Sequence, residues 1–322
     1  MTAEYALFGH RISSPIELQG LAPADGLPEH APAIELKVEC SLRAGPEFRG
    51  EVSIPHEVGG VPGRLGFVRN PDESFALFIN EGTQMCARID HDPVANRIAI
   101  NEDSPTNPIE VTSVLVSPSM PLMLRASLRY FPLHASVLAS RGRAIAICGR
   151  SGAGKTTFAQ FAASRSFTIV ADDLAAIDAE TGVVHHGAKF VRVNEARHED
   201  PVLQGAGPNP PRMPKDLVYT GDNFFWNAPG ALPLSAVILL SEFDKDASMR
   251  LDRVSMPEAA LALNRNMSGE IFPTTAQMRQ KGFAAATRVA KRIPVFRLHR
   301  PRGLEHLEQT EKLIRQTVLA ER

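Results

Sequence analysis

Cysteine is scarce in this chain of 322 residues, and its scarcity excludes two ways of stabilising a fold. The three cysteines, Cys40, Cys86 and Cys148, are odd in number and widely spaced, and no Cys-x-x-Cys pair occurs. A zinc knuckle or a disulfide framework is therefore not expected. A reducing cytoplasm, in which free thiols persist, fits this pattern best.

The sequence also lacks an excess of charge of either sign and any long apolar run. Lys and Arg number 35 against 36 for Asp and Glu, which argues against nucleic acid or an anionic membrane as the main partner. No apolar stretch approaches the roughly 18 residues that a membrane span needs. The first residues show no basic region followed by an apolar run, so no signal peptide is expected. We therefore predict a cytoplasmic protein that binds neither membrane nor nucleic acid.

Short apolar or alternating runs dominate the first part of the chain, to about residue 125. Gly, Pro, Asn and Asp separate these runs, as turns between strands require. No helix of convincing length is expected before residue 118, whereas Leu122, Leu124, Leu128 and Phe131 predict one from about residue 119. We predict a β-rich N-terminal domain over residues 1–120.

Strands and helices are mixed in the remainder, residues 121–322, which predicts an α/β nucleotide-binding domain. The first of its elements is a hairpin that turns at Arg141 to Arg143. A helix over about 154–164, a strand ending near residue 173 and a strand pair turning at 180–182 follow. The later pattern predicts a strand near 235–243, helices at 256–267 and 275–293, a strand at 294–300 and a terminal helix.

The proline-rich segment from Pro201 to Pro233 has little periodicity, and long irregular stretches of this kind are usually functional or disordered. It could close over an acceptor, or it could be a solvent loop with an aromatic plug into the core. The sequence leaves both interpretations open. Its basic and aromatic side chains are Arg212, Lys215, Tyr219, Phe224, Phe225 and Trp226.

Residues 149–156, GRSGAGKT, match the phosphate-binding pattern GxxxxGK[ST] completely, with a predicted strand before and a helix after. Gly152 and Gly154 permit the tight wrap that aims backbone N–H groups at a phosphate. Lys155 is expected to reach the β- and γ-phosphates and Thr156 to hold Mg²⁺. The predicted nucleotide contacts are Gly149, Arg150, Ser151, Gly152, Ala153, Gly154, Lys155, Thr156 and Thr157.

Two acids, Asp172 and Asp173, end the next predicted strand. If that strand is a parallel neighbour of the one before the loop, both carboxylates lie beside the phosphates. One carboxylate can then hold Mg²⁺ and the other can accept a proton from an attacking hydroxyl. His134 begins the first strand of the hairpin, and the sequence does not settle whether it faces the phosphate end of the sheet. On these grounds alone we read it as structural, because a lone histidine is more often structural than catalytic.

The order His134, phosphate loop and Ala171-Asp172-Asp173 resembles the HPr kinase/phosphorylase family over about residues 133–178. The resemblance implies a P-loop fold related to phosphoenolpyruvate carboxykinase, with ATP and Mg²⁺ as cofactors. It also implies Asp173 as the base that takes the serine proton, His134 as its partner and Lys155 as a phosphate ligand. Thr156, Asp172 and Glu195 are the implied metal residues.

The chain departs from the HPr enzymes at Arg150 and Thr157, and its first 120 residues do not resemble theirs. The runs YALFGHRISSPIELQGL and RIPVFRLHRPRGLEHL are similar to HPr-kinase-related proteins found beside ribosomal-peptide gene clusters. Some of these are lasso peptide kinases, which phosphorylate the C-terminal serine of a precursor peptide. The resemblance therefore implies a serine kinase acting on a peptide or small protein, and it allows a homo-oligomer.

Other functions stay open at this point. An HPr(Ser) kinase/phosphorylase proper and a small-molecule kinase of the shikimate or gluconate type use similar elements, although in the latter the loop lies near the chain start. A carboxykinase-like enzyme is a more remote alternative. A non-catalytic sensor would bind ATP only to change a partner interaction.

Overall fold

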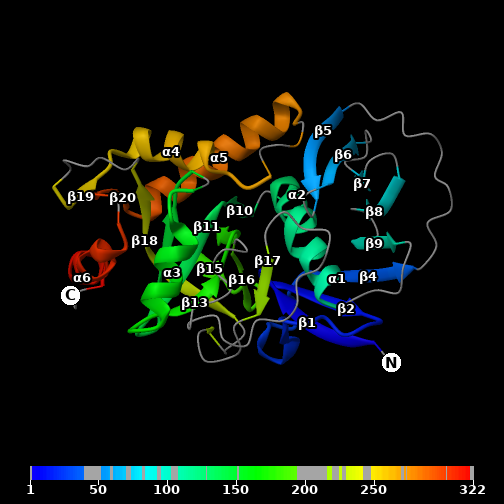
Figure 1. Ribbon diagram of the computed structural model, residues 1–322, viewed down its shortest axis with the longest axis horizontal. Helices are drawn as coiled ribbons and strands as arrows, with labels where there is room; N and C mark the ends of the chain where they lie inside the picture. The colour runs from blue at the N-terminus through cyan, green and yellow to red at the C-terminus, as the bar shows by residue number, and fades with distance from the viewer. Residues whose placement is uncertain are drawn as a thin grey trace.

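The computed structural model shows a mixed α/β protein (Figure 1). It describes residues 2–39, 52–58, 61–69, 74–81, 84–92, 96–102, 108–127, 129–150, 152–193, 216–219, 225–226, 230–241, 248–269, 272, 274–301 and 303–319. Within these residues, no helix combines the length and the apolarity needed to cross a membrane.

The first part of the chain forms a nine-stranded sheet among the described residues, in the order β3-β1-β2-β4-β9-β8-β7-β6-β5. Alternation buries one face: in β9, Ile98 and Ile100 are inaccessible, whereas Arg97 and Ala99 are half-buried. The predicted β-rich character is confirmed. The strands are β1 Ala3–Leu7, β2 His10–Ser14, β3 Ala22–Pro23, β4 Ala33–Glu39, β5 Val52–Val58, β6 Val61–Arg69, β7 Phe75–Glu81, β8 Gln84–Asp92 and β9 Arg97–Glu102.

Two short helices, α1 (Pro108–Val114) and α2 (Met120–Ala126), follow this sheet, so the expectation of no helix before residue 118 is wrong. A kink at Ser117 separates them, with φ −152° and ψ 115°. The residue before a proline is kept out of the helical region, and residue 118 is proline. The predicted continuation to Phe131 is also wrong, because Phe131 lies in strand β10 (Tyr130–Leu133). Leu128 lies outside the described residues.

A second sheet, with nine strands in the part of the chain that the structure describes, holds the later strands. Its order is β10-β14-β15-β18-β12-β11-β13, with β20 and β19 beyond β18. The predicted hairpin is confirmed: β11 (Ala135–Ser140) and β12 (Arg143–Cys148) are antiparallel. Arg141 and Gly142 both have positive φ, 52° and 74°, as two-residue hairpin turns favour. The other strands are β13 Thr168–Ala171, β14 Ala175–Asp178, β15 Val183–His185, β18 Ala231–Leu240, β19 Arg250–Arg253 and β20 Val295–His299.

Strand β13, which precedes the two acids, is not the neighbour of β12 that the sequence suggested. β11 lies between them and is antiparallel to both. Because two reversals restore the direction, β12 and β13 still run the same way and end at the same edge of the sheet. The expected adjacency is wrong, but its consequence for the acids holds.

Both faces of this sheet are covered. Along β12, Ala144 and Ala146 belong to a large apolar cluster that also includes side chains of the first sheet, whereas Ile145 and Ile147 belong to a second cluster. The second cluster is closed by α3 (Lys155–Ala163) and α6 (Leu307–Val318), and helices α4 (Met256–Arg265) and α5 (Ala276–Arg292) pack on the other side (Figure 1). These helices confirm the predicted ones. The division of the chain at residue 120 stays a prediction.

Most of the proline-rich segment lies outside the described residues, including Arg212, Lys215 and Phe224. Phe225 is buried, and the amide of Trp226 donates to the carbonyl of Ile169 at 2.8 Å. These two residues therefore pack against β13, as the aromatic-plug interpretation expects. Strand β17 (Asp216–Tyr219) lies within the segment and pairs antiparallel with β16 (Phe190–Val193), which precedes the segment.

Candidate active site

The phosphate loop connects the end of β12 to the start of α3, as the sequence pattern predicts. Gly152 and Gly154 have φ of 81° and 86°, in the left-handed region that favours glycine. The loop closes on itself through the amide of Ala153, which donates to the carbonyl of Arg150 at 3.1 Å. Gly149 is tightly packed, since a Cβ there would lie 3.2 Å from Cβ of Leu240. Ser151 lies outside the described residues.

Lys155 and Thr156 begin α3 directly at the loop. The Lys155 ammonium is buried and donates to the carbonyls of Gly149 at 2.8 Å and Arg150 at 3.3 Å. It is thus held at the rim of the loop, where a phosphate would be contacted. Thr157 lies in the same first turn, partly buried.

Asp172 is brought to the loop by β13. The hydroxyl of Thr156 donates to its Oδ2 at 3.1 Å, and the hydroxyl of Ser136, on the intervening strand β11, donates to its Oδ1. Burial raises the pKa of the Asp172 carboxyl above its ordinary value, the Ser136 hydrogen bond opposes this, and the charge of Asp173 adds to it. A cation at this carboxylate would relieve the cost of burying its charge.

The oxygen atoms of Thr156 and Asp172 suit Mg²⁺, which binds through one or two carboxylates together with waters and substrate phosphates. No three His, Cys, Asp or Glu side chains gather into a metal site among the described residues. This donor set fits Mg²⁺ that also contacts a nucleotide, rather than a cage made by protein alone. The third metal residue that the sequence suggested, Glu195, lies outside the described residues.

Asp173 and His134 form a pair beside this carboxylate. His134 Nδ1 lies 3.2 Å from Oδ1 of Asp173 and 2.9 Å from its carbonyl oxygen. Since both partners are acceptors, Nδ1 carries the proton in this arrangement. Asp173 has φ 68°, unusual for a residue with a side chain and typical of functional sites. Both side chains are about one-third exposed, 32% and 30%, so a substrate can reach them.

Strand register settles the position of His134. Ala135 is paired with Cys148, so the residue before β11 lies at the edge where the phosphate loop begins. The amide of His134 donates to the carbonyl of Asn266 at 2.8 Å, which fixes its backbone. The fold therefore brings together the loop, both acids and the histidine, as the sequence order suggested.

Two residues at the site escaped the sequence analysis. Ser136 is fully buried in an apolar strand, and a hydroxyl in such a run was the one available signal. Arg300 is 4% exposed, and its Nη2 donates to the carbonyl of Ala153 at 2.6 Å. Nothing in the sequence around Arg300 connects it to a loop some 150 positions earlier.

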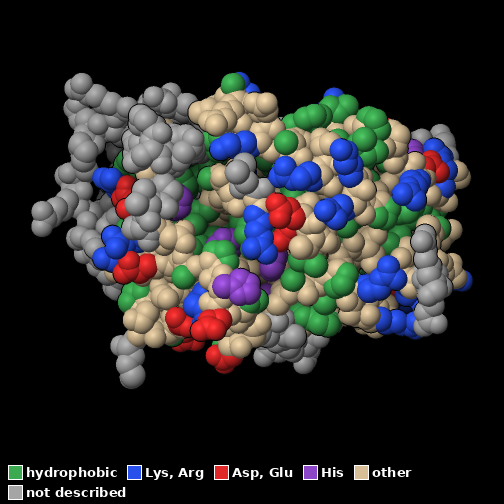
Figure 2. Space-filling view, turned by 180° about the vertical axis from the view of Figure 1, so that it is seen from behind, with side chains coloured by type: hydrophobic (Ala, Val, Ile, Leu, Met, Phe, Trp, Pro, Cys, Tyr) green, Lys and Arg blue, Asp and Glu red, His purple; other side chains and the backbone are tan. Residues whose placement is uncertain are grey.

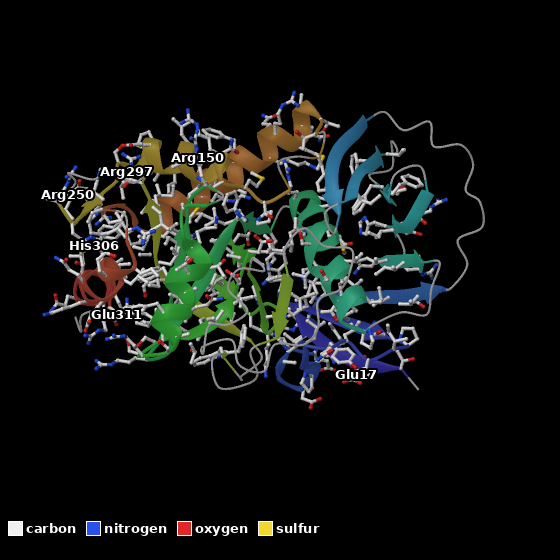
Figure 3. All side chains as sticks on the ribbon, in the orientation of Figure 1. Glu17, Arg150, Arg250, Arg297, His306 and Glu311 are labelled. Atoms are coloured by element: carbon white, nitrogen blue, oxygen red, sulfur yellow. The ribbon has the colours of Figure 1, made fainter. Side chains whose placement is uncertain are left out.

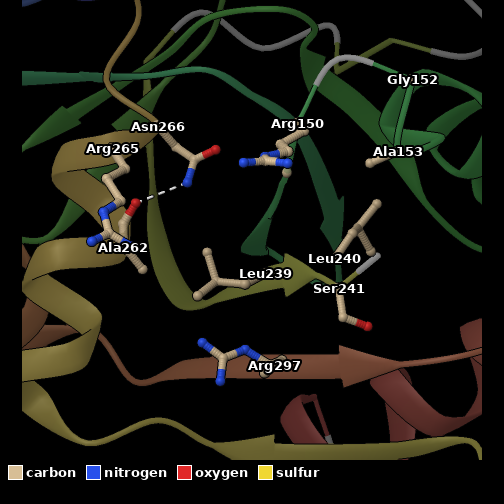
Figure 4. Close-up of a pocket in the computed structure, with 11 residues that line it drawn as sticks. Arg150, Gly152, Ala153, Leu239, Leu240, Ser241, Ala262, Arg265, Asn266 and Arg297 are labelled. Atoms are coloured by element: carbon tan, nitrogen blue, oxygen red, sulfur yellow. Dashed lines mark hydrogen bonds between the residues drawn. The ribbon is translucent and has the colours of Figure 1, made fainter. Parts of the chain in front are cut away.

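A cavity of about 430 Å³ adjoins the loop on its β18 side (Figure 4). Its eleven lining residues include three arginines, Arg150, Arg265 and Arg297, and none of them is acidic. Arg297 also pairs with Glu258 at 2.8 Å. Figure 3 shows Arg150 and Arg297 on the side of the molecule that carries α4. Asn266 also lines this cavity, and its carbonyl accepts the amide of His134 at 2.8 Å.

No protein-family model matches the chain. No curated protein matches it. Among solved structures, the HPr(Ser) kinase/phosphatase from Coxiella burnetii is similar with a TM-score of 0.33 and 13% identity, over 58% of this chain and 96% of that one. A TM-score of this size carries no conclusion about activity, and the finer assignment to an HPr kinase-like fold stays a prediction.

Proposed function

We propose that the chain is an ATP- and Mg²⁺-dependent phosphotransferase that acts on a serine hydroxyl of a peptide or small protein. The observation that supports this most is the contact between the loop hydroxyl of Thr156 and the buried carboxylate of Asp172, with the Asp173–His134 pair beside it. In this proposal the arrangement would supply a phosphate site, a metal site and an accessible base at one edge of a sheet.

Each residue has a distinct role in this proposal. ATP supplies the phosphoryl group when bound, and Mg²⁺ neutralises its charge. Thr156 and Asp172 would hold the metal, and Lys155 and the loop amides would bind the phosphates. Asp173 would accept the proton of the serine hydroxyl as the serine oxygen bonds to the γ-phosphorus and the bond to the β-phosphate oxygen breaks. The proton on His134 Nδ1 orients the Asp173 carboxylate.

A peptide acceptor, such as the C-terminal serine of a lasso-type precursor, is favoured by the resemblance of residues 5–21 and 292–307 to lasso peptide kinases. A small-molecule kinase is disfavoured because 148 residues precede the loop here. A sensor that only binds ATP would have no need of an oriented, accessible carboxylate beside the metal site.

The test compares Asp173→Asn with wild type in ATP binding by calorimetry and in phosphate transfer to candidate serine peptides by mass spectrometry. We expect ATP affinity to be retained and transfer to fall by about 100-fold or more, the usual contribution of a general base. The control is Glu29→Gln, an exposed acid between β3 and β4.

Asp172→Asn separates the metal role from the base. This variant should require more Mg²⁺ for ATP binding, whereas Asp173→Asn should not. The sensor would be supported instead if wild-type protein bound MgATP but transferred phosphate to none of three acceptors: serine peptides, HPr and small hydroxyl compounds.

A further inference from the structure

Arg300 is the most deeply buried arginine of the described residues, and it lies behind the phosphate loop. Its side chain is 4% exposed although arginine is almost never fully buried without a reason. It follows β20, whose end is tied to the end of β18: the amide and hydroxyl of Ser241 both donate to the carbonyl of Leu298, at 3.1 and 2.7 Å. These bonds fix the end of β20 and therefore the position of Arg300, which follows it.

One hydrogen bond joins the guanidinium of Arg300 to the loop, and the same group lies close to Gly154. Nη2 donates to the carbonyl of Ala153 at 2.6 Å, and the same atom lies 3.2 Å from the position that a Cβ on Gly154 would occupy. The carbonyl of Ala153 is thereby turned toward Arg300, so it does not point at an anion held by the loop. Gly154 is the residue before Lys155, at the start of α3, where backbone N–H groups meet a phosphate.

Burying a guanidinium is costly, and burial lowers the pKa of Arg300 from its ordinary value. Arginine nevertheless stays protonated in proteins. A fixed positive charge thus lies within contact distance of the backbone that surrounds the phosphate site, in a water-poor setting where it acts more strongly than at the surface.

We propose that Arg300 is a positioning residue of the nucleotide site: it fixes the loop through the Ala153 carbonyl and adds buried positive charge behind the bound phosphates. The proposal rests on the proposed function. It assigns part of the affinity for phosphate to a residue of the C-terminal region that contacts the loop from behind and need not touch the nucleotide.

The test measures the affinities of ATP, ADP and AMP, each with Mg²⁺, for wild type, Arg300→Met and Arg300→Lys. Met keeps much of the stem but removes the charge. We expect the ATP affinity to fall by about tenfold or more, the ADP affinity by less and the AMP affinity least, because Coulomb attraction weakens with distance and the β- and γ-phosphates are the ones that the loop holds. Arg300→Lys should recover most of the loss. Arg250→Met, which removes an exposed arginine of β19 (Figure 3), should change none of the three.

Thermal unfolding verifies that each variant is folded, and Arg300→Gln replaces Arg300→Met if the latter is not. A loss equal for ATP, ADP and AMP, or no loss at all, would overturn the proposal, since it would mean that Arg300 only supports the fold. Wild-type protein that binds none of the three nucleotides would instead overturn the proposed function, so the two failures are distinguishable.

Discussion

Acid should destabilise this protein through a half-buried histidine, His185, whose two ring nitrogens are inaccessible to solvent. His185, in β15, packs against the β1–β2 turn so closely that a Cβ on Gly9 would lie 2.7 Å from its Nδ1. Its ring also meets Tyr130 edge-on, with centroids 5.4 Å apart. Neither ring nitrogen hydrogen-bonds within the described residues. Burial lowers the pKa of His185 to about 4; Asp178 opposes this, and nearby positive groups add to it, namely His10, His186 and Arg129.

The sign follows from which state binds the proton. The unfolded chain takes up a proton near pH 6.5 and the folded chain only near pH 4, so acid favours unfolding over that window. Between these values His185 should remove about 1.4 kcal/mol of unfolding free energy per pH unit, or about 2 kcal/mol at pH 5 relative to pH 8. His10 and His186, whose pKa values burial also lowers, should add to the effect.

The measurement is urea unfolding of wild type and His185→Leu from pH 4.5 to pH 8. Leucine has a similar volume and no proton to bind, so the variant should lose less stability on acidification, by about 2 kcal/mol at pH 5. Its stability at pH 8 should stay within about 1 kcal/mol of wild type, because no hydrogen bond is removed. His30→Leu, at an exposed position, serves as control. Identical pH slopes for wild type and His185→Leu would refute the reasoning.

Three further substitutions test the site and its support. Ser136→Ala should weaken Mg²⁺ binding to the ATP complex by about tenfold, since a hydrogen bond to the charged Asp172 is worth about 1.5–3 kcal/mol; an unchanged Mg²⁺ titration would contradict this. Gly154→Ala should cost about 1–2 kcal/mol in backbone strain at φ 86° and crowd Arg300, so a wild-type ATP affinity would be the unexpected result. Phe158→Ala should lower the free energy of unfolding by about 3–5 kcal/mol, because this side chain is fully buried, and a loss below about 1 kcal/mol in urea would count against the packing described.

Local structure was largely predictable, because its causes are local. The hairpin turn needs positive φ at two adjacent positions, and Gly142 accepts it readily. The phosphate loop needs glycine at fixed spacings, and Gly152 and Gly154 supply it. The first helix escaped detection because α1 is only seven residues long, PIEVTSV, and two of its polar residues, Thr112 and Ser113, are buried. A periodic pattern needs more turns than that to be recognised.

The sequence by itself determined the glycine loop, the strands and helices around it, and the identity of the acids and the histidine, since these depend on backbone preferences and on neighbours within a few residues. Only the tertiary structure decided that β11 separates β12 from β13 and places Ser136 on the Asp172 carboxylate. It also decided that β20 delivers Arg300 to the back of the loop. Such contacts join segments far apart in the chain, and they follow from the order of strands in a sheet and the packing of its faces, which no local pattern encodes.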